Sequence, residues 1–169
     1  MPVPPNSHLK PPPQDDLPLL DRSNAAGLIA RGVMRYFAAH GIVGLAEMTL
    51  RSGRRADLLC LDAKSRITIV EIKSSLEDFR SDQKWPEYLE YCDHFYFAVA
   101  ESFPQAVLPP EQGLMVADGY GASVIRESGD FALNPARRRA LLLQFAQLAA
   151  GRLQAVIDPD GMAGRLEGF

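Results

Sequence analysis

Residues 54–73 decide the fold, and they read Arg-Arg-Ala-Asp-Leu-Leu-Cys-Leu, then Asp-Ala-Lys-Ser-Arg, then Ile-Thr-Ile-Val-Glu-Ile-Lys. Each apolar half is typical of a short β-strand, and the polar residues 62–66 supply the turn between the two strands. If the strands pair symmetrically around that turn, Asp57 lies opposite Glu71, with the two Cβ atoms about 5 Å apart. Lys73 is two residues beyond Glu71 and therefore projects to the same side. The sequence thus predicts two carboxylates and one ammonium together at one end of a hairpin.

The rest of this hairpin is apolar on both faces, which is typical of strands that are covered on both sides. Two carboxylates at the rim of such a sheet repel each other, and burying either one without a partner is costly. A divalent cation removes this conflict, because Mg²⁺ takes oxygen ligands from one or two carboxylates and keeps several waters. The alternative is a rim salt bridge, in which Glu71 pairs with Lys73 and Asp57 pairs with Arg55. The spacing and the apolar frame favour the cation site.

The pattern of Asp57, a turn and then Glu71-Ile72-Lys73 resembles the core motif of the PD-(D/E)XK nuclease superfamily. Over roughly residues 22 to 130 the chain resembles, more specifically, the MmcB-like DNA repair proteins. The segments that carry this closer resemblance are Arg54-Arg55-Ala56-Asp57, Val70-Glu71-Ile72-Lys73-Ser74-Ser75, Asp78-Phe79, Asp82, Lys84-Trp85, Tyr88 and Cys92-Asp93.

The resemblance implies that Asp57 and Glu71 bind Mg²⁺ or Mn²⁺, and that Lys73 orients or polarises the attacking water. Many members of the superfamily carry a further glutamate on the first helix. The first helix expected here, from about residue 25 to residue 40, has no acidic residue. Glu47, on the first strand, is the candidate substitute as a third ligand.

Composition and charge limit the function classes. The chain has 169 residues, 47% of them apolar and 23% charged, which fits one soluble globular domain with a real core. A net charge of −3 counts against a tight, non-specific binder of duplex DNA. Cys60 and Cys92 lack metal-ligand spacing, so we expect buried, reduced thiols. We expect no signal peptide and no 18-residue apolar stretch, and therefore a cytoplasmic protein with no membrane contact.

The expected fold class is α/β, with a restriction-endonuclease-like α-β-β-β-α-β core, a mixed four-stranded sheet flanked by helices, and a further C-terminal helix. The fourth strand, residues 95–100, follows a helix, and such a crossover makes it parallel to the strand of Glu71. The expected domains are a disordered Pro-rich arm (1–20), a PD-(D/E)XK-like domain (21–150) and a C-terminal tail (151–169). Two lesser strands, residues 114–117 and 122–126, are expected after the core.

Several basic residues are candidates for binding a nucleic-acid backbone. Arg51, Arg54 and Arg55 lie next to the carboxylate pair, where they either steady phosphates or neutralise local carboxylates. Arg31 and Arg35 lie one turn apart on the first helix, as a solvated stripe or a phosphate contact. Lys84 is placed to reach a phosphate or Glu71. A further basic run, at residues 137–139, crowds the start of the last helix, where an anionic partner or a carboxylate of the chain would offset it.

These patterns predict a DNA repair protein that acts as a metal-dependent DNA phosphodiesterase of the PD-(D/E)XK type. The first alternative is a catalytically silent module of the same fold that binds DNA or a repair partner, and the second is an RNA-processing nuclease. The expected partners are DNA, in branched or damaged form, and repair proteins. Nothing in the sequence sets the oligomeric state.

Overall fold

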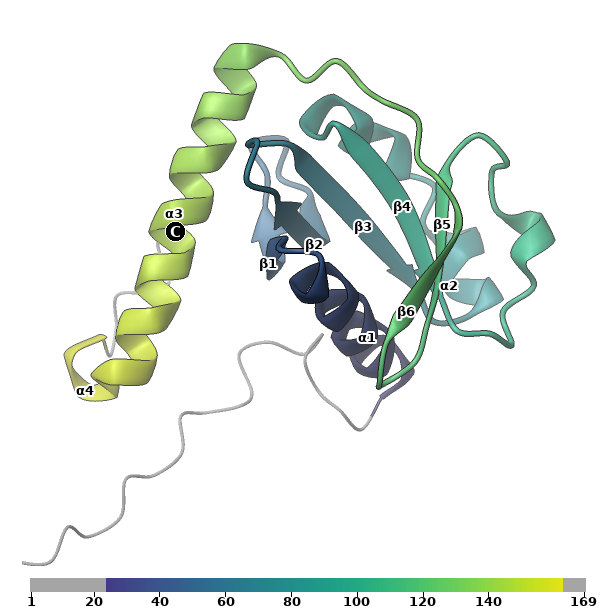
Figure 1. Ribbon diagram of the computed structural model, residues 1–169, viewed down its shortest axis with the longest axis horizontal. Coiled ribbons are helices and arrows are strands. Elements are labelled where there is room, and N and C mark those ends of the chain that lie inside the picture. Colours follow the sequence, from purple (N-terminus) through teal and green to yellow (C-terminus); the bar gives the residue numbers. More distant parts are fainter. Residues whose placement is uncertain (1–23, 163–169) are drawn as a thin grey trace, which may run out of the picture.

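A six-stranded mixed sheet organises the protein, and its strands lie side by side in chain order, β1 to β6 (Figure 1). The computed structural model describes residues 24–162. The elements are α1 (Ala25–Ala39), β1 (Val43–Thr49), β2 (Arg55–Leu61), β3 (Ile67–Lys73), α2 (Leu76–Ser81), η3 (Trp85–Tyr91), β4 (His94–Val99), η4 (Gln105–Val107), β5 (Gly113–Ala117), β6 (Ala122–Arg126), α3 (Pro135–Ile157) and α4 (Pro159–Met162). The strands β3, β4 and β5 run parallel, and the other neighbouring pairs are antiparallel.

The hairpin of β2 and β3 has the register expected from the sequence. Leu59 pairs with Ile69, and the ladder runs from the turn as far as Leu58 and Val70. Beyond that pair a side chain replaces the backbone as the acceptor. The Oδ2 atom of Asp57 accepts a hydrogen bond of 2.8 Å from the backbone N–H of Ile72. All seven residues of β3 are buried, as expected for a strand covered on both faces.

The expectation of a four-stranded sheet is wrong, because β5 and β6 continue the sheet beyond β4. Leu114 of β5 lies opposite Phe97, and Met115 lies opposite Ala98. Four of the five residues of β5 are buried, so this short strand is a central one with neighbours on both sides. β6 then forms the outer edge, and its alternating burial is typical of an edge strand with one exposed face.

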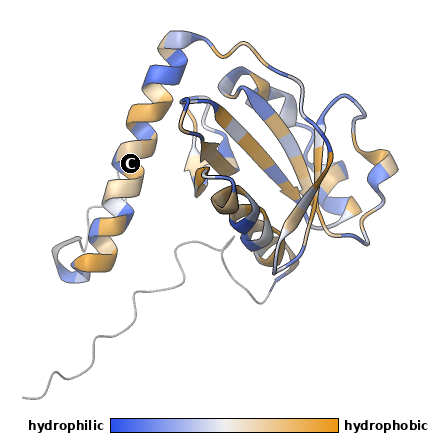
Figure 2. Ribbon diagram, in the orientation of Figure 1, coloured by the Kyte–Doolittle hydropathy of each residue, from blue (hydrophilic) through white to orange (hydrophobic). Residues whose placement is uncertain are grey.

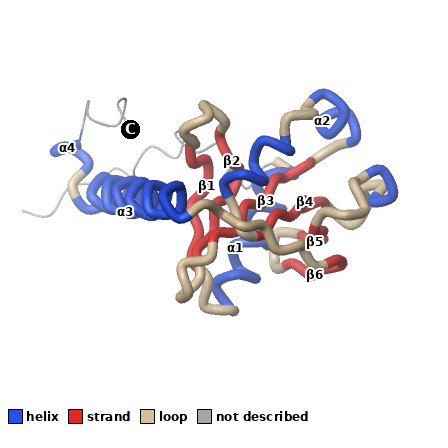
Figure 3. The backbone as a smooth tube through the Cα atoms, turned by 90° about the horizontal axis from the view of Figure 1, so that it is seen from above, coloured by secondary structure: helices blue, strands red, loops and turns tan. Residues whose placement is uncertain are grey.

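The two faces of the sheet are covered by different helices (Figure 3). α1 begins at an Asn24 cap and packs Ile29, Val33 and Phe37 against one face. The other face is covered by η3, whose Trp85 stacks on Phe95 at 5.8 Å between ring centroids. Trp85 therefore packs against the core, and the central strands carry long apolar stretches (Figure 2).

Two short helices follow the candidate site directly. α2 is capped by Ser75, whose Oγ accepts a hydrogen bond from the N–H of Asp78. Pro86 stands in the first turn of η3, as expected for a proline that starts a second short helix.

α3 lies along the β1 edge of the sheet (Figures 1 and 3). It begins at an Asn134 cap with a proline in its first turn. The side chains of Gln144 and Arg152 donate hydrogen bonds of 2.6 Å and 2.7 Å to the carbonyls of Thr49 and Ala46 on β1. These bonds satisfy acceptors that an edge strand would otherwise leave open.

α3 runs on to Ile157, so residue 151, where the tail was expected to begin, lies inside a helix. The expected Pro-rich arm, residues 1–20, lies outside the described residues. Within the described part of the chain, α3 is long and apolar enough to cross a membrane, by length and composition only. The expectation that no such stretch exists is therefore wrong on those two criteria.

Candidate functional site

The C-terminal end of β3 opens into a pocket of about 320 Å³. Asp57 comes to it from β2, and Glu71 and Lys73 come from β3, so the structure brings the three predicted residues together. Asp82, which directly follows α2, completes the polar wall of the pocket.

Glu71 is the buried acid of this site, with 4% of its surface exposed. Its Oε1 accepts a hydrogen bond of 3.1 Å from Lys73, while its Oε2 is buried and has no hydrogen-bond partner among the described residues. Burial, and next the negative charge of Asp57, raise the pKa of Glu71 to about 8. A buried carboxylate oxygen without a partner is costly, so this atom is available to a ligand.

Asp57 is oriented by the backbone of the neighbouring strand. Its Oδ2 accepts the N–H of Ile72, and burial raises the pKa of Asp57 to about 6 even though that hydrogen bond acts in the opposite direction. The charge of Lys73 also favours the carboxylate form, whereas Asp78 and Glu47 disfavour it. The two neighbouring acids thus both have raised pKa values, the condition that a bound cation relieves.

Lys73 is held between two carboxylates. Its Nζ lies 3.1 Å from Glu71 Oε1 and 3.0 Å from Asp82 Oδ2, and the side chain is only 2% exposed. Burial lowers the pKa of Lys73, but Glu71 and Asp82 outweigh burial and raise it, so the ammonium stays charged. The expected pair of Glu71 with Lys73 is present. Asp82 was not assigned this role from the sequence, although it lies among the residues that carry the family resemblance.

The donor set suits a hard divalent cation with two carboxylate ligands. The open oxygens are Glu71 Oε2 and the second oxygen of Asp57, and such a cation completes its shell with waters. Within residues 24–162, no group of three or more His, Cys, Asp or Glu side chains is placed to hold one metal ion.

Glu47, the candidate third ligand, does not line the pocket. It lies on β1, at a positive φ of 54°, between the ladder positions of Ala46 and Met48. Its carboxylate is 3.8 Å from Arg55. It is close enough to Asp57 to raise the pKa of that residue, so its influence on the site is electrostatic.

The three arginines beside the carboxylates differ in their partners. Arg54 makes a two-point ion pair with Glu87, at 2.9 Å and 2.8 Å, so it neutralises a local carboxylate. Arg55 lines the pocket with 61% of its side chain exposed, and its ion-pair partner is Glu47 rather than Asp57. Arg51 is exposed on the turn after β1. Arg55 and Arg51 are therefore the two arginines best placed to meet a phosphate.

The remaining basic candidates lie away from the pocket. Lys84 is exposed and does not line the pocket, and it is Lys73 that reaches Glu71. Arg35 donates to the carbonyls of Gly119 and Tyr120, and neither it nor Arg31 lines the pocket.

The basic run at the start of α3 is matched by carboxylates of the chain itself. Arg138 makes two hydrogen bonds of 2.6 Å to Asp93, and Arg137 lies 3.3 Å from Glu90. Of the two partners expected for this run, a carboxylate of the chain is therefore the one found at Arg137 and Arg138. Arg139 is exposed.

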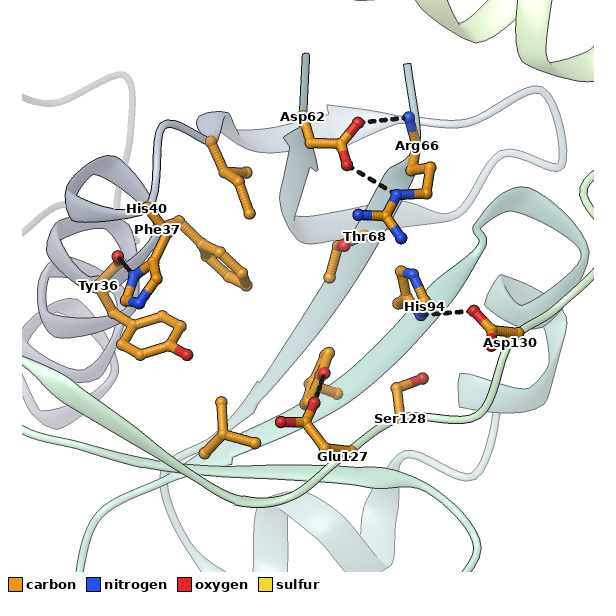
Figure 4. Close-up of a pocket in the computed structure, with 13 residues that line it drawn as sticks. Tyr36, Phe37, His40, Asp62, Arg66, Thr68, His94, Glu127, Ser128 and Asp130 are labelled. Atoms are coloured by element: carbon orange, nitrogen blue, oxygen red, sulfur yellow. Dashed lines mark hydrogen bonds and ion pairs between the residues drawn. The ribbon is translucent and has the colours of Figure 1, made fainter. Parts of the chain in front are cut away.

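A second pocket, of about 310 Å³, lies at the opposite end of β3 and on the α1 face of the sheet (Figure 4). Its acidic groups already have partners: Asp62 pairs with Arg66 at 2.8 Å, Asp130 lies 3.6 Å from His94, and Glu127 accepts the hydroxyl of Tyr96 at 2.8 Å. The pocket with the orphaned carboxylate oxygen is thus the one at the other end of β3.

The chain is similar to known proteins over most of its length. The family described as "MmcB-like: DNA repair protein MmcB-like" matches residues 14–160. Among solved structures, the chain is similar to the SPO1766 protein of unknown function from Silicibacter pomeroyi, with 46% identity and a TM-score of 0.76 over 79% of this chain and 92% of that one. No curated protein matches the chain. The match over residues 14–160 spans most of the sequence, and the chain belongs to the MmcB-like DNA repair protein family.

Proposed function

We propose that this protein is a metal-dependent DNA phosphodiesterase of the PD-(D/E)XK type that acts in repair. One observation carries the proposal: Glu71 presents a buried, unpartnered Oε2 into an open pocket, beside Asp57 and the ammonium of Lys73. A stable fold has no need to bury two neighbouring carboxylates at a rim, so a ligand-binding role explains their burial better than packing does.

Each group has a chemical role in phosphodiester hydrolysis. Asp57 and Glu71 hold a Mg²⁺ or Mn²⁺ ion, which when bound lowers the pKa of water and offsets negative charge on the phosphate. Lys73 keeps its proton between Glu71 and Asp82, and its ammonium orients the attacking water or stabilises the developing negative charge. The backbone N–H of Ile72 fixes the direction of the Asp57 carboxylate.

The family and the local charge support DNA as the substrate. The family is one of DNA repair proteins. Arg55 lines the pocket with most of its side chain in solvent, and the exposed Arg51 follows the neighbouring strand. One exposed guanidinium group at the site and a second on the turn after β1 suit a phosphate backbone, while the net charge of −3 limits contacts elsewhere.

A second function is favoured by a different observation. Both carboxylates that touch Lys73 hold it by ion pairs, and its side chain is almost fully buried. A site closed by its own ion pairs suits a silent module that binds DNA without cutting it. In that case Lys73 neutralises Glu71 and does no chemistry.

One experiment separates the two functions. Mn²⁺ binding is measured by calorimetry, and cleavage is measured on branched, nicked, duplex and single-stranded DNA, for the parent, Asp57→Asn and Asp130→Asn. The amide oxygen in Asp57→Asn can still accept the Ile72 N–H, so the fold is kept, and Asp130 is an exposed acid beside the second pocket that serves as the control. The nuclease predicts Mn²⁺ binding and cleavage by the parent and the control, both lost in Asp57→Asn. DNA binding without cleavage on any of these substrates would establish the silent module.

A further inference from the structure

The outward face of α3 carries a regular apolar stripe that no described residue covers. Leu143, Leu153 and Ile157 have 62%, 59% and 72% of their surface exposed, although they are among the largest apolar side chains of the helix. Only Leu141 and Phe145 of α3 are buried, so the helix uses its other side to hold the sheet. Exposed apolar residues that form one continuous surface usually mark an interaction site.

The spacing of the stripe specifies a helix as its partner. The exposed residues along it are Leu143, Ala146, Ala150, Leu153 and Ile157. They recur at intervals of three, four, three and four, which is the pattern of the seam between two packed helices. At 1.5 Å per residue the stripe is about 20 Å long. Alanines at its middle let two backbones approach closely, with the larger side chains toward either end.

The charges at the two ends of α3 specify the direction of the partner helix. Arg139, exposed, extends the stripe beyond Leu143 at the N-terminal end. Asp160, also exposed, lies in α4 just beyond Ile157 at the other end. Two parallel copies would bring their basic ends together, whereas two antiparallel copies bring Arg139 of each near Asp160 of the other. Gln147 and Gln154 flank the stripe without charge, so the seam itself contains no repulsion between identical helices.

We propose that a second copy of this chain covers the stripe, with the two α3 helices antiparallel and crossing at Ala150. The symmetry of the stripe fits this arrangement, because Leu143 of one copy then meets the Ile157 end of the other. A twofold interface uses the same patch on both copies, which this centred pattern provides. The dimer leaves the pocket at the end of β3 outside the interface.

A membrane is the alternative occupant, since α3 passes the length and composition test for a span. Two features weigh against it. Gln144 and Arg152 tie α3 to the carbonyls of β1, so the helix is committed to the sheet. A helix that lies on a bilayer carries Lys and Arg along its polar flanks, whereas the flanks of this stripe are uncharged.

Sedimentation equilibrium of the full chain at high micromolar concentration tests the proposal, with Ala150→Glu as the disrupting variant. A glutamate at the crossing point faces its own copy, so the parent should have the mass of two chains and Ala150→Glu the mass of one. Ala63→Glu, in the exposed turn after β2, adds the same charge away from the helix and should stay dimeric. Circular dichroism confirms that each variant is folded.

A charge exchange tests the antiparallel direction. Arg139→Glu should weaken the dimer at least tenfold, and adding Asp160→Arg to it should restore the parent affinity. A parent that stays monomeric, a dimer that is unaffected by Ala150→Glu, or a double variant as weak as Arg139→Glu would each overturn the proposal. Monomeric parent that sediments with vesicles of phosphatidylcholine and phosphatidylglycerol would instead assign the stripe to a membrane.

Discussion

The ammonium of Lys73 lies 3.0 Å from the carboxylate of Asp82, an ion pair that joins the end of β3 to the residue following α2. The same ammonium contacts Glu71 at 3.1 Å, so the position of the charge in the pocket depends on both acids. Asp82 is 35% exposed in its side chain and Lys73 only 2%, so the pair forms where the pocket opens to solvent. This arrangement makes Asp82 a positioning residue that acts through Lys73.

Asp82→Asn should therefore lower kcat of the DNA cleavage reaction while leaving KM nearly unchanged. A misplaced outer-shell partner typically costs about 10- to 100-fold. Glu87→Gln is the matched control, because Glu87 is a nearby acid that pairs with Arg54 instead of Lys73. Equal kcat values for Asp82→Asn and the parent would mean that Glu71 alone positions the ammonium.

The raised pKa of Glu71 predicts how stability depends on pH without metal. The folded-state pKa is about 8, above the ordinary value of 4.5, so the folded protein holds this proton more tightly than the unfolded chain. That contribution to stability is complete below pH 4.5 and is lost as the pH rises through 8. The parent should lose stability over this window, and Glu71→Gln, which cannot ionise, should not lose this part.

Thermal unfolding from pH 5 to pH 9 measures the effect. The advantage of Glu71→Gln over the parent should grow with pH and level off above pH 8, at about 4 kcal/mol more than at pH 5. Saturating Mn²⁺ should cancel the loss in the parent, because the ion stabilises the ionised carboxylates. A difference between the two proteins that stays constant with pH would show that Glu71 is already ionised in the folded protein.

Arg55 and Arg51 predict the salt dependence of DNA binding. Each phosphate contact releases counterions, so replacing one such arginine with glutamine should reduce the slope of log Kd against log salt by about 1. Arg66→Gln is the control, because Arg66 is also half exposed but pairs with Asp62 at the far end of the hairpin. Fluorescence anisotropy with duplex DNA at several salt concentrations gives the slopes. If Arg55→Gln and Arg66→Gln have the same slope as the parent, the DNA lies elsewhere on the protein.

The local parts of the fold could be predicted because short-range rules determine them. A five-residue turn between two apolar runs sets the hairpin register, and that register alone brings Asp57, Glu71 and Lys73 together. The caps at Asn24, Ser75 and Asn134 follow short-range rules too, because each is a small polar residue directly before a helix.

The long-range parts could not be predicted, because sequence spacing says nothing about them. Arg54 meets Glu87 across 33 positions, which decided that this arginine neutralises a carboxylate instead of facing a phosphate. The place of β5 between β4 and β6 depends on its pairing with β4, and no local pattern reveals that pairing. The extent of α3 was missed because its exposed apolar stripe does not resemble the helix face that packs on a core.

The central claim, that this site cuts DNA with the help of Lys73, is tested most directly by single-turnover cleavage of branched DNA in Mn²⁺ by Lys73→Met. Methionine keeps the volume of the buried side chain and removes the charge, so β3 should survive. Lys73→Met should bind DNA with the affinity of the parent and cleave it at a rate about 10²- to 10⁴-fold below that of the parent. Cleavage by Lys73→Met at the parental rate would contradict a role of Lys73 in the reaction. Lys73 would then be only the ion-pair partner of Glu71 and Asp82.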